Sequence, residues 1–97
     1  MAIRLDQYNN QLYVSDTVNQ RIRKITPEGV VTTLAGNGSV GSTNGSAAGA
    51  SFSYPRDVAV DSAGNVYVAD ANNNLIRKIM NYLSYIKDEI YIINDAL

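Results

Sequence analysis

The chain has 97 residues, with eight basic and nine acidic side chains and a formal net charge of −1. Its length allows one small domain, and its near-neutral charge argues against a nucleic-acid or membrane-surface partner. It contains no cysteine and no histidine, which excludes disulfides, thiolate metal sites and the commonest general base and transition-metal ligand. No apolar run approaches the roughly 18 residues of a membrane span.

The first third of the chain, about residues 3–35, predicts one unit of four short antiparallel strands. Alternating apolar residues bounded by Asn, Gly, Asp and Ser are the signal for such strands. The expected strands, joined by turn-rich stretches, are Ile3–Asp6, Leu12–Val14, Ile22–Ile25 and Val30–Leu34.

Residues 36–53 follow as a long connector rich in Gly, Ser, Ala and Asn, without apolar periodicity. A second unit then occupies about residues 54–86. Leu12–Ile25 matches Val66–Ile79 at an offset of 54, and eight of the fourteen positions are identical. Such identity in so short a chain establishes an internal repeat.

The C-terminal segment, residues 87–97, is predicted as an extra strand or a helix. Apolar residues at spacings of three and four between Leu83 and Leu97 suit an amphipathic helix. Tyr and Ile dominate residues 82–93, however, and both favour strands. We prefer a strand hairpin, and the last strands could complete the blade of a neighbouring copy.

The second unit resembles a bacterial NHL repeat. The resemblance is carried by the run Asp57–Asp70, then by Asn73 and the Ile-Arg-Lys-Ile run that ends at Ile79, and it covers about residues 3–79. Two features depart from the family pattern: Gln20 and Asn74 stand where a His often follows the turn Asn, and the segment after Ile79 diverges.

The resemblance implies an all-β fold, with the whole chain, residues 1–97, forming a single partial β-propeller domain of two four-stranded antiparallel blades. Propellers need about four to eight blades to close, so two blades leave apolar faces uncovered. We therefore expect either a fragment of a longer propeller or a ring completed by oligomerisation. Three chains would supply six blades, so a homotrimer is favoured over a dimer.

Polar loop residues are the candidate binding site for a protein, peptide or glycan. They follow the second strand of each unit: Asn19, Gln20, Asn72, Asn73 and Asn74. Asn also caps turns and tolerates left-handed geometry, so a purely structural role is the default interpretation.

The repeated charged residues are expected to be structural. Asp16 and Asp70 each close a strand, where we expect Asx-type turns and only weakly a cation site. Arg23-Lys24 and Arg77-Lys78 lie between isoleucines, so one member of each pair is expected to insert between blades and form a salt bridge with an Asp.

Tyrosine is the dominant aromatic residue, with seven Tyr, one Phe and no Trp. Tyr13 and Tyr67 occupy equivalent strand positions and are predicted to be core residues with a bonded hydroxyl. Tyr82, Tyr85 and Tyr91 are candidates for an oligomer interface.

The sequence favours a non-enzymatic interaction or scaffold module of NHL-propeller type, with no catalytic residue, cofactor or metal. The alternative is a calcium-assisted hydrolase or lactonase assembled in the channel of an oligomeric propeller, with oxygen ligands such as Asp16 and Asp70. The first residues lack the features of a secretory leader; the chain as given is expected to be soluble, and its compartment is left open.

Overall fold

The computed structural model describes the backbone of residues 1–81 and 90–96 and the side chains of residues 1–80. It is built from two antiparallel sheets, without an α-helix in the described segments. None of the described helical segments has the length and apolar character needed to cross a bilayer. The expected all-β class is confirmed.

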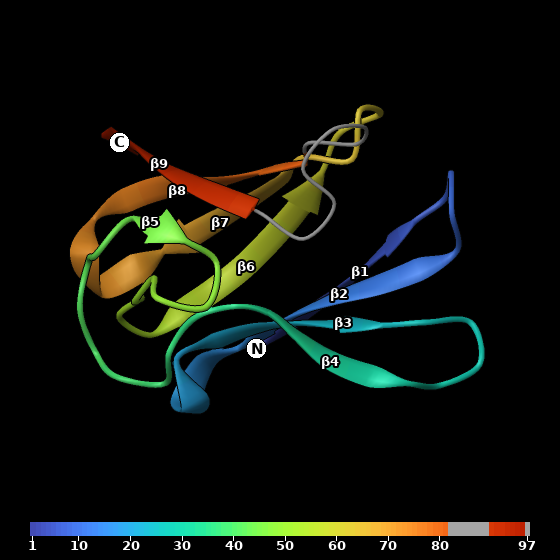
Figure 1. Cartoon of the computed structure of the whole chain (residues 1–97), viewed down its shortest axis with the longest axis horizontal. Coiled ribbons are helices and arrows are strands. Elements are labelled where there is room, and N and C mark those ends of the chain that lie inside the picture. Colours follow the sequence, from blue (N-terminus) through green and yellow to red (C-terminus); the bar gives the residue numbers. More distant parts are fainter. Residues whose placement is uncertain (82–89, 97) are drawn as a thin grey trace.

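The first sheet is a meander of four strands in the order β1-β2-β3-β4 (Figure 1). Its strands are β1 (Ala2–Asp6), β2 (Gln11–Asp16), β3 (Arg21–Ile25) and β4 (Val31–Ala35). The register places Leu5, Leu12, Ile25 and Val31 opposite one another across the sheet. One face of the sheet therefore carries an apolar row.

The second sheet has the order β5-β9-β8-β7-β6. Its strands are β5 (Gly45–Ser46), β6 (Pro55–Val60), β7 (Val66–Asp70), β8 (Leu75–Asn81) and β9 (Ile90–Ala96). Strands β6 to β8 repeat β1 to β3, and β9 occupies the position of β4 beside β8. Each repeat thus forms one antiparallel blade, as the sequence predicts, but the second sheet also includes the two-residue strand β5 from the connector.

Strand β9 pairs with β8 of the same chain, with Leu75 opposite Ala96 and Asn81 opposite Ile90. The sequence predicts residues 87–97 as an extra strand or helix, whose strands could complete the blade of a neighbouring copy of the chain. In the structure, residues 90–96 form a strand, as preferred over a helix, but the strand pairs within its own sheet, between β8 and β5. A strand that covers an adjacent edge satisfies a row of backbone groups at little loop-closure cost. Residues 82–89 lie outside the described residues.

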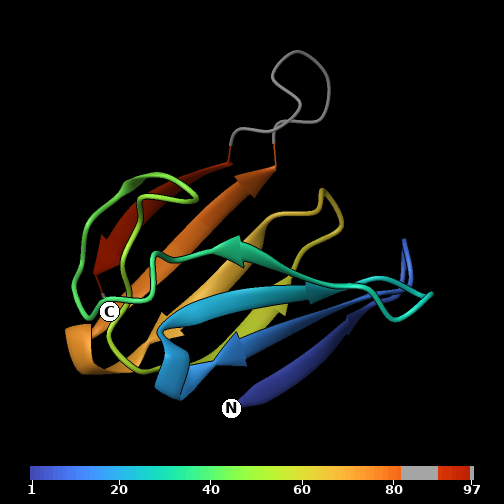
Figure 2. The ribbon, with the colours of Figure 1, turned by 60° about the horizontal axis from the view of Figure 1, so that its bottom comes forward.

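The core lies between the two sheets (Figure 2). The first sheet contributes Tyr13, Ile22 and Ala35, and the second contributes Val58, Val66, Val68 and Ile79 from the opposite face of the repeat. Strand β6 packs against β1 and β2. The repeat therefore stacks front to back, so the face of the first sheet equivalent to the Val66–Val68 face of the second has no blade over it among the described residues.

The sequence predicts residues 36–53 as a long connector between the blades, but its C-terminal part contributes to the core. Ala50, Ser51, Phe52 and Ser53 are buried, and Ala50 and Phe52 belong to the core. Gly36 begins the connector at φ +106°, and a Cβ there would lie 2.6 Å from the carbonyl oxygen of Gln20. Glycine is thus required where the connector leaves β4.

Candidate functional site

A short 3-10 turn follows the second strand of each repeat and defines the end of the sheet where polar residues gather. The turns are η1 (Thr17–Asn19) and η2 (Ala71–Asn73). Each ends on a left-handed residue, Gln20 at φ 58° or Asn74 at φ 56°. Asn adopts this conformation readily, whereas Gln does so rarely. The two turns have nearly the same geometry although their sequences differ.

In the second repeat, Asp70 and Arg77 form an ion pair in the interior. Arg77 Nη1 lies 2.7 Å from Asp70 Oδ2, and both side chains have no exposed surface. The Nδ2 of Asn73 donates to the same carboxylate oxygen at 2.7 Å, and the Ser53 N–H donates to the other oxygen at 2.7 Å. Burial of this pair is tolerable because the carboxylate is surrounded by donors.

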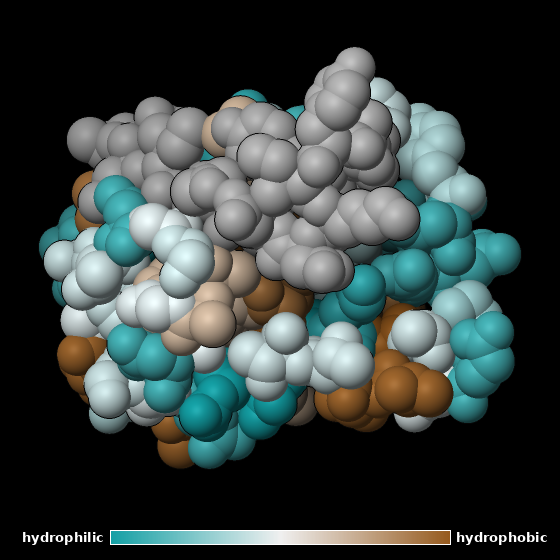
Figure 3. Space-filling model, viewed as in Figure 1, coloured by the Kyte–Doolittle hydropathy of each residue, from teal (hydrophilic) through white to brown (hydrophobic). Residues whose placement is uncertain are grey.

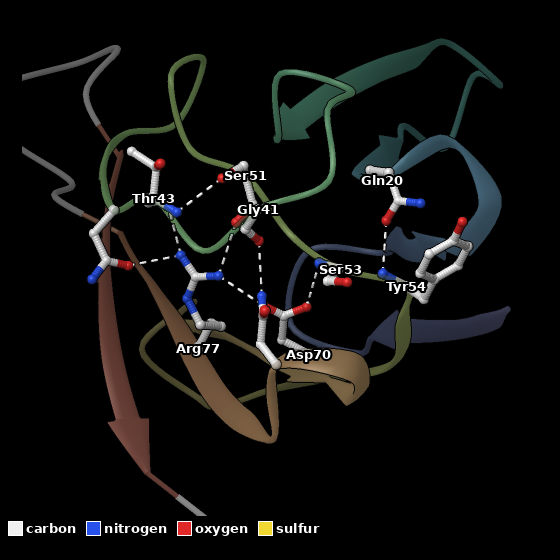
Figure 4. Close-up of polar contacts among 10 residues, drawn as sticks. Gln20, Gly41, Thr43, Ser51, Ser53, Tyr54, Asp70 and Arg77 are labelled. Carbon is white, nitrogen blue, oxygen red and sulfur yellow. Dashed lines mark hydrogen bonds and ion pairs between the residues drawn. The ribbon is translucent and has the colours of Figure 1, made fainter.

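The connector covers Arg77 with backbone carbonyl groups (Figure 4). Arg77 Nη1 donates to Ser51 O at 2.9 Å, and Nη2 donates to Thr43 O at 2.9 Å and to the Asn44 side chain at 2.7 Å. The Phe52 ring lies 5.0 Å from the guanidinium carbon, within cation–π range. The guanidinium thus holds the connector onto the second blade. Its Nε is buried without a hydrogen-bond partner among the described residues.

In the first repeat, the equivalent residues Asp16, Asn19 and Arg23 are partly exposed. Arg23 Nε lies 3.1 Å from Asp16 Oδ2, and the two side chains are 29% and 22% exposed. The Asn19 amide donates to Asp16 at 3.1 Å, and Arg23 Nη1 donates to Thr33 Oγ1 at 2.6 Å. The predicted Arg–Asp salt bridges are confirmed in both repeats. The predicted insertion between blades is wrong for Arg23, which is 29% exposed on the face of the first sheet that no described blade covers.

The expected Asx turns at Asp16 and Asp70 are wrong. Neither carboxylate caps the turn that follows it, because each carboxylate is bonded to the Arg seven residues later. Asx-turn bonds are instead made by Asp6, which accepts from the Tyr8 N–H, and by Asp61.

Asp61 holds the hairpin that joins β6 to β7. Its carboxylate accepts from the N–H groups of Ala63 and Asn65, from the Asn65 side chain and from the Tyr67 hydroxyl. These hydrogen bonds, the Asn65 side chain foremost, lower the pKa of Asp61. The expectation that Tyr67 has a bonded hydroxyl is confirmed, but its predicted place in the core is wrong: Tyr67 is half-buried and lies on the face of its sheet opposite Val66 and Val68. Tyr13 is buried as expected, and burial raises its pKa.

The five candidate loop residues have different environments. Asn19, Asn72 and Asn74 are exposed. Gln20 is 3% exposed, and its Oε1 accepts from the Tyr54 N–H at 2.7 Å, which joins the first blade to the start of the second (Figure 4). Asn73 is half-buried and donates to Gly41 O and Asp70. Three of the five are therefore available at the surface.

The candidate interface tyrosines cannot be placed in the same way. Tyr82 and Tyr85 lie outside the described residues, and of Tyr91 only the backbone is described, in β9. Their role in an oligomer interface stays a prediction.

The two carboxylates considered as calcium ligands are already paired with arginines. Among the described side chains, those of residues 1–80, no group of three or more acidic, His or Cys residues is arranged to hold a metal ion. A calcium ion at Asp16 or Asp70 would have to displace the adjacent guanidinium.

The residues that sequence reasoning missed belong to the connector. Thr43, Ser51 and Ser53 contact the Asp70–Arg77 pair through backbone groups. Such contacts are hard to predict from the amino-acid sequence, because they use backbone groups rather than particular side chains. The available signal was Phe52, the single Phe of the chain, in an otherwise small and polar segment.

Comparison with known proteins supports the repeat assignment. The family model described as NHL repeat matches residues 52–79, which begin within the connector and end within β8. The chain is 42% identical over 72 residues to Protein SUPPRESSOR OF QUENCHING 1, chloroplastic, from Arabidopsis thaliana, covering 73% of this chain and 7% of that protein. It is 35% identical over 80 residues to NHL repeat-containing protein 2 from Bos taurus, covering 79% of this chain and 11% of that protein.

A solved structure has the same arrangement of strands. It is a structural genomics protein of unknown function from Bacteroides thetaiotaomicron, with a TM-score of 0.78 and 24% identity, and the match covers 95% of this chain and 22% of that one. At this identity the likeness concerns the fold alone.

Two repeated antiparallel sheets, stacked front to back and joined by a clamped connector, define a partial β-propeller. The chain belongs to the NHL-repeat family. It spans 7% and 11% of the length of the two curated relatives described above.

Proposed function

We propose that the chain is a non-enzymatic interaction module that binds a protein or peptide through the loops at η1 and η2. One observation carries this proposal: both turns lie at the same end of the two sheets (Figures 1 and 2) and expose side-chain amides. These amides lie beside Asp and Arg side chains that already form ion pairs within the chain. The exposed amides are Asn19, Asn72 and Asn74. An amide can donate and accept, which suits recognition of peptide groups.

A protein or peptide is favoured over a glycan because apolar side chains accompany the amides. Val18 in η1 is 80% exposed, and Tyr54, next to the buried Gln20, is 40% exposed. A mixture of aromatic, apolar and amide groups is typical of protein contacts. The overall charge of −1 gives no electrostatic reason for a nucleic-acid partner.

The test selects ligands from a displayed peptide library and compares the wild-type chain with a variant carrying Asn72→Ser and Asn74→Gly. Glycine preserves the left-handed backbone at position 74, so the variant should fold normally. The control is Tyr8→Ser, in the exposed hairpin between β1 and β2. Selected peptides should bind the control but bind the loop variant at least tenfold more weakly. Equal affinity for both variants, or selection of glycans but not peptides from a parallel array, would contradict the proposal.

We also propose that the chain associates with itself, as a trimer rather than a dimer. The support is the uncovered face of the first sheet, where Ile3 is 52% exposed and Leu5 and Val31 are each 58% exposed. Figure 3 shows an apolar patch over β4, which begins at Val31. Val30, just before the strand, is 55% exposed. Exposed apolar faces of this kind favour protein contacts. Light scattering of the intact chain tests the proposal, and a compact folded monomer at micromolar concentration would refute it.

A further inference from the structure

The connector contains the two Asn-Gly dipeptides of the chain, Asn37-Gly38 and Asn44-Gly45, and each is followed by a serine. In such a dipeptide the glycine nitrogen can attack the side-chain amide of the preceding Asn, because glycine places no Cβ beside the attacking atom. The local sequences of the two dipeptides are nearly the same. A difference in their reactivity therefore has to come from the fold.

The side-chain amide of Asn44 is bonded to a buried positive charge. Its Oδ1 accepts from Arg77 Nη2 at 2.7 Å, and Arg77 has no exposed surface, so water screens this charge weakly. Attack on the amide carbon moves negative charge onto Oδ1, and a fixed charged donor at that oxygen stabilises the transition state. The guanidinium therefore activates the Asn44 amide in the way that an oxyanion hole activates a carbonyl group.

The space around Asn44-Gly45 leaves room for the reaction. Asn44 is exposed, and the contact at Oδ1 is the one hydrogen bond that its side chain makes with the described residues, so none of them holds the departing Nδ2. A Cβ added at Gly45 would meet no described atom within 4 Å. The described residues therefore leave the amide carbon open to the glycine nitrogen and to water.

The other dipeptide, Asn37-Gly38, lacks this activation. Asn37 Oδ1 accepts from the uncharged Ser39 N–H at 2.8 Å, and its Nδ2 donates to Gly49 O at 3.3 Å. Arg21 Nη2 lies 3.5 Å from the backbone oxygen of Asn37, not from its side chain, and a Cβ at Gly38 would lie 2.6 Å from the same Nη2. The Asn37 amide is thus held at both ends, and a guanidinium crowds its glycine.

We propose that Asn44 is a modification site, at which spontaneous deamidation is promoted by Arg77 and outpaces deamidation of Asn37. The Gly45 nitrogen loses its proton to solvent and bonds to Asn44 Cγ, which closes a succinimide ring. The Cγ–Nδ2 bond breaks, and Nδ2 takes up a proton and leaves as ammonia. Water then opens the ring to Asp or isoaspartate, without an oxidant or reductant. The site lies in the connector and goes beyond the binding function proposed for the loops at η1 and η2.

The test incubates the intact chain in mildly alkaline buffer and locates the mass gain of deamidation by fragment-ion mass spectrometry. In the folded chain, Asn44 should deamidate at least about tenfold faster than Asn37, since loss of one oxyanion donor costs enzymes about 100-fold or more. In concentrated urea, where the fold no longer holds Arg77 against Asn44, the two rates should become similar. Equal rates in the folded chain, or the same ratio of rates in urea, would overturn the proposal.

A double variant tests the role of the guanidinium. Arg77→Met with Asp70→Asn removes the donor together with the charge of its buried partner. With the fold verified by circular dichroism, the rate at Asn44 should fall to that at Asn37, and a rate that stays tenfold higher would overturn the role of Arg77. If the double variant does not fold, the comparison between buffer and urea still decides.

The product is tested by comparing Asn44→Asp with the matched control Asn44→Ala. A carboxylate accepts from a guanidinium more strongly than a neutral group does, whereas Ala leaves Nη2 of Arg77 without this acceptor. Asn44→Asp should therefore melt at a higher temperature than Asn44→Ala, and the reverse order would contradict the contact with Arg77. Peptide selection at the η1 and η2 loops does not involve Asn44, so the failure of one proposal is distinguishable from the failure of the other.

Discussion

Removing the acidic partner of the buried arginine should destabilise the chain far more than removing its counterpart in the first repeat. In Asp70→Ala, Arg77 keeps its charge with no exposed surface, and the Ser53 N–H loses its acceptor. Breaking one partner of a buried pair costs about 3–5 kcal/mol. Asp16→Ala leaves Arg23 29% exposed, where water can solvate it, so the expected cost is at most about 1 kcal/mol.

The assay is urea denaturation followed by circular dichroism, with a thermal melt in parallel. A domain of this size has about 5–15 kcal/mol of total stability. The melting temperature of Asp70→Ala should fall by at least about 12 °C. The expected loss of stability is at least about 3 kcal/mol, and each kcal/mol lowers the melting temperature of a domain this size by about 4 °C or more.

Equal losses in the Asp70 and Asp16 variants would refute the reasoning, because the difference rests on burial alone. If Asp70→Ala does not fold, Asp70→Asn provides the same comparison, since it removes the charge but keeps an acceptor oxygen of the same size. Adding Arg77→Met to Asp70→Asn removes the second buried charge and should recover part of the lost stability.

Three further outcomes are expected. Gly36→Ala should cost about 1–3 kcal/mol in urea denaturation, from positive φ and the 2.6 Å approach to Gln20 O, and more than Gly29→Ala, where a Cβ meets nothing within 4 Å. The carboxyl of Asp61 should titrate by NMR below the ordinary value of about 3.9, and Asn65→Ala should raise its pKa. Calcium up to millimolar concentration should leave the melting temperature unchanged, because no described carboxylate cluster binds it.

Each of these three predictions would be contradicted by a specific result. Equal costs at Gly36 and Gly29 would mean that the close approach is relieved by movement of the backbone. Since the pKa of Asp61 is lowered in the folded state, its stabilising contribution is present above the unfolded pKa and is lost as the pH falls through the folded value. A carboxyl that titrates at or above about 3.9 would contradict this. A rise in melting temperature with calcium would favour the hydrolase alternative.

The strands and the repeat could be predicted from the sequence because their signals are local or periodic. The Ile-Arg-Lys-Ile runs mark β3 and β8, and the salt bridges of Arg23 and Arg77 followed from charged residues placed between isoleucines. These inferences need only the alternation of side chains along a strand.

The connector and the buried amide could not be predicted because they depend on contacts between distant residues. Gln20 is buried, and its Oε1 accepts from the Tyr54 N–H, which lies 34 residues later in the chain. Likewise, Ser51 and Thr43 are bound through their carbonyl groups, which every residue possesses. The assignment of β9 to the second sheet required the pairing partner, since its Ile and Tyr residues indicate a strand without naming the edge it joins.

The clamped connector has a consequence for how the chain folds. Arg77 can be desolvated only when the connector, which follows β4, supplies its carbonyl acceptors. The second sheet therefore cannot form its buried interior independently of the first. The two repeats should therefore open and close as one cooperative unit in hydrogen exchange, with shared protection of β3 and β8. In the two blades of this chain, the stability of each blade therefore depends on the other through one buried guanidinium group, that of Arg77.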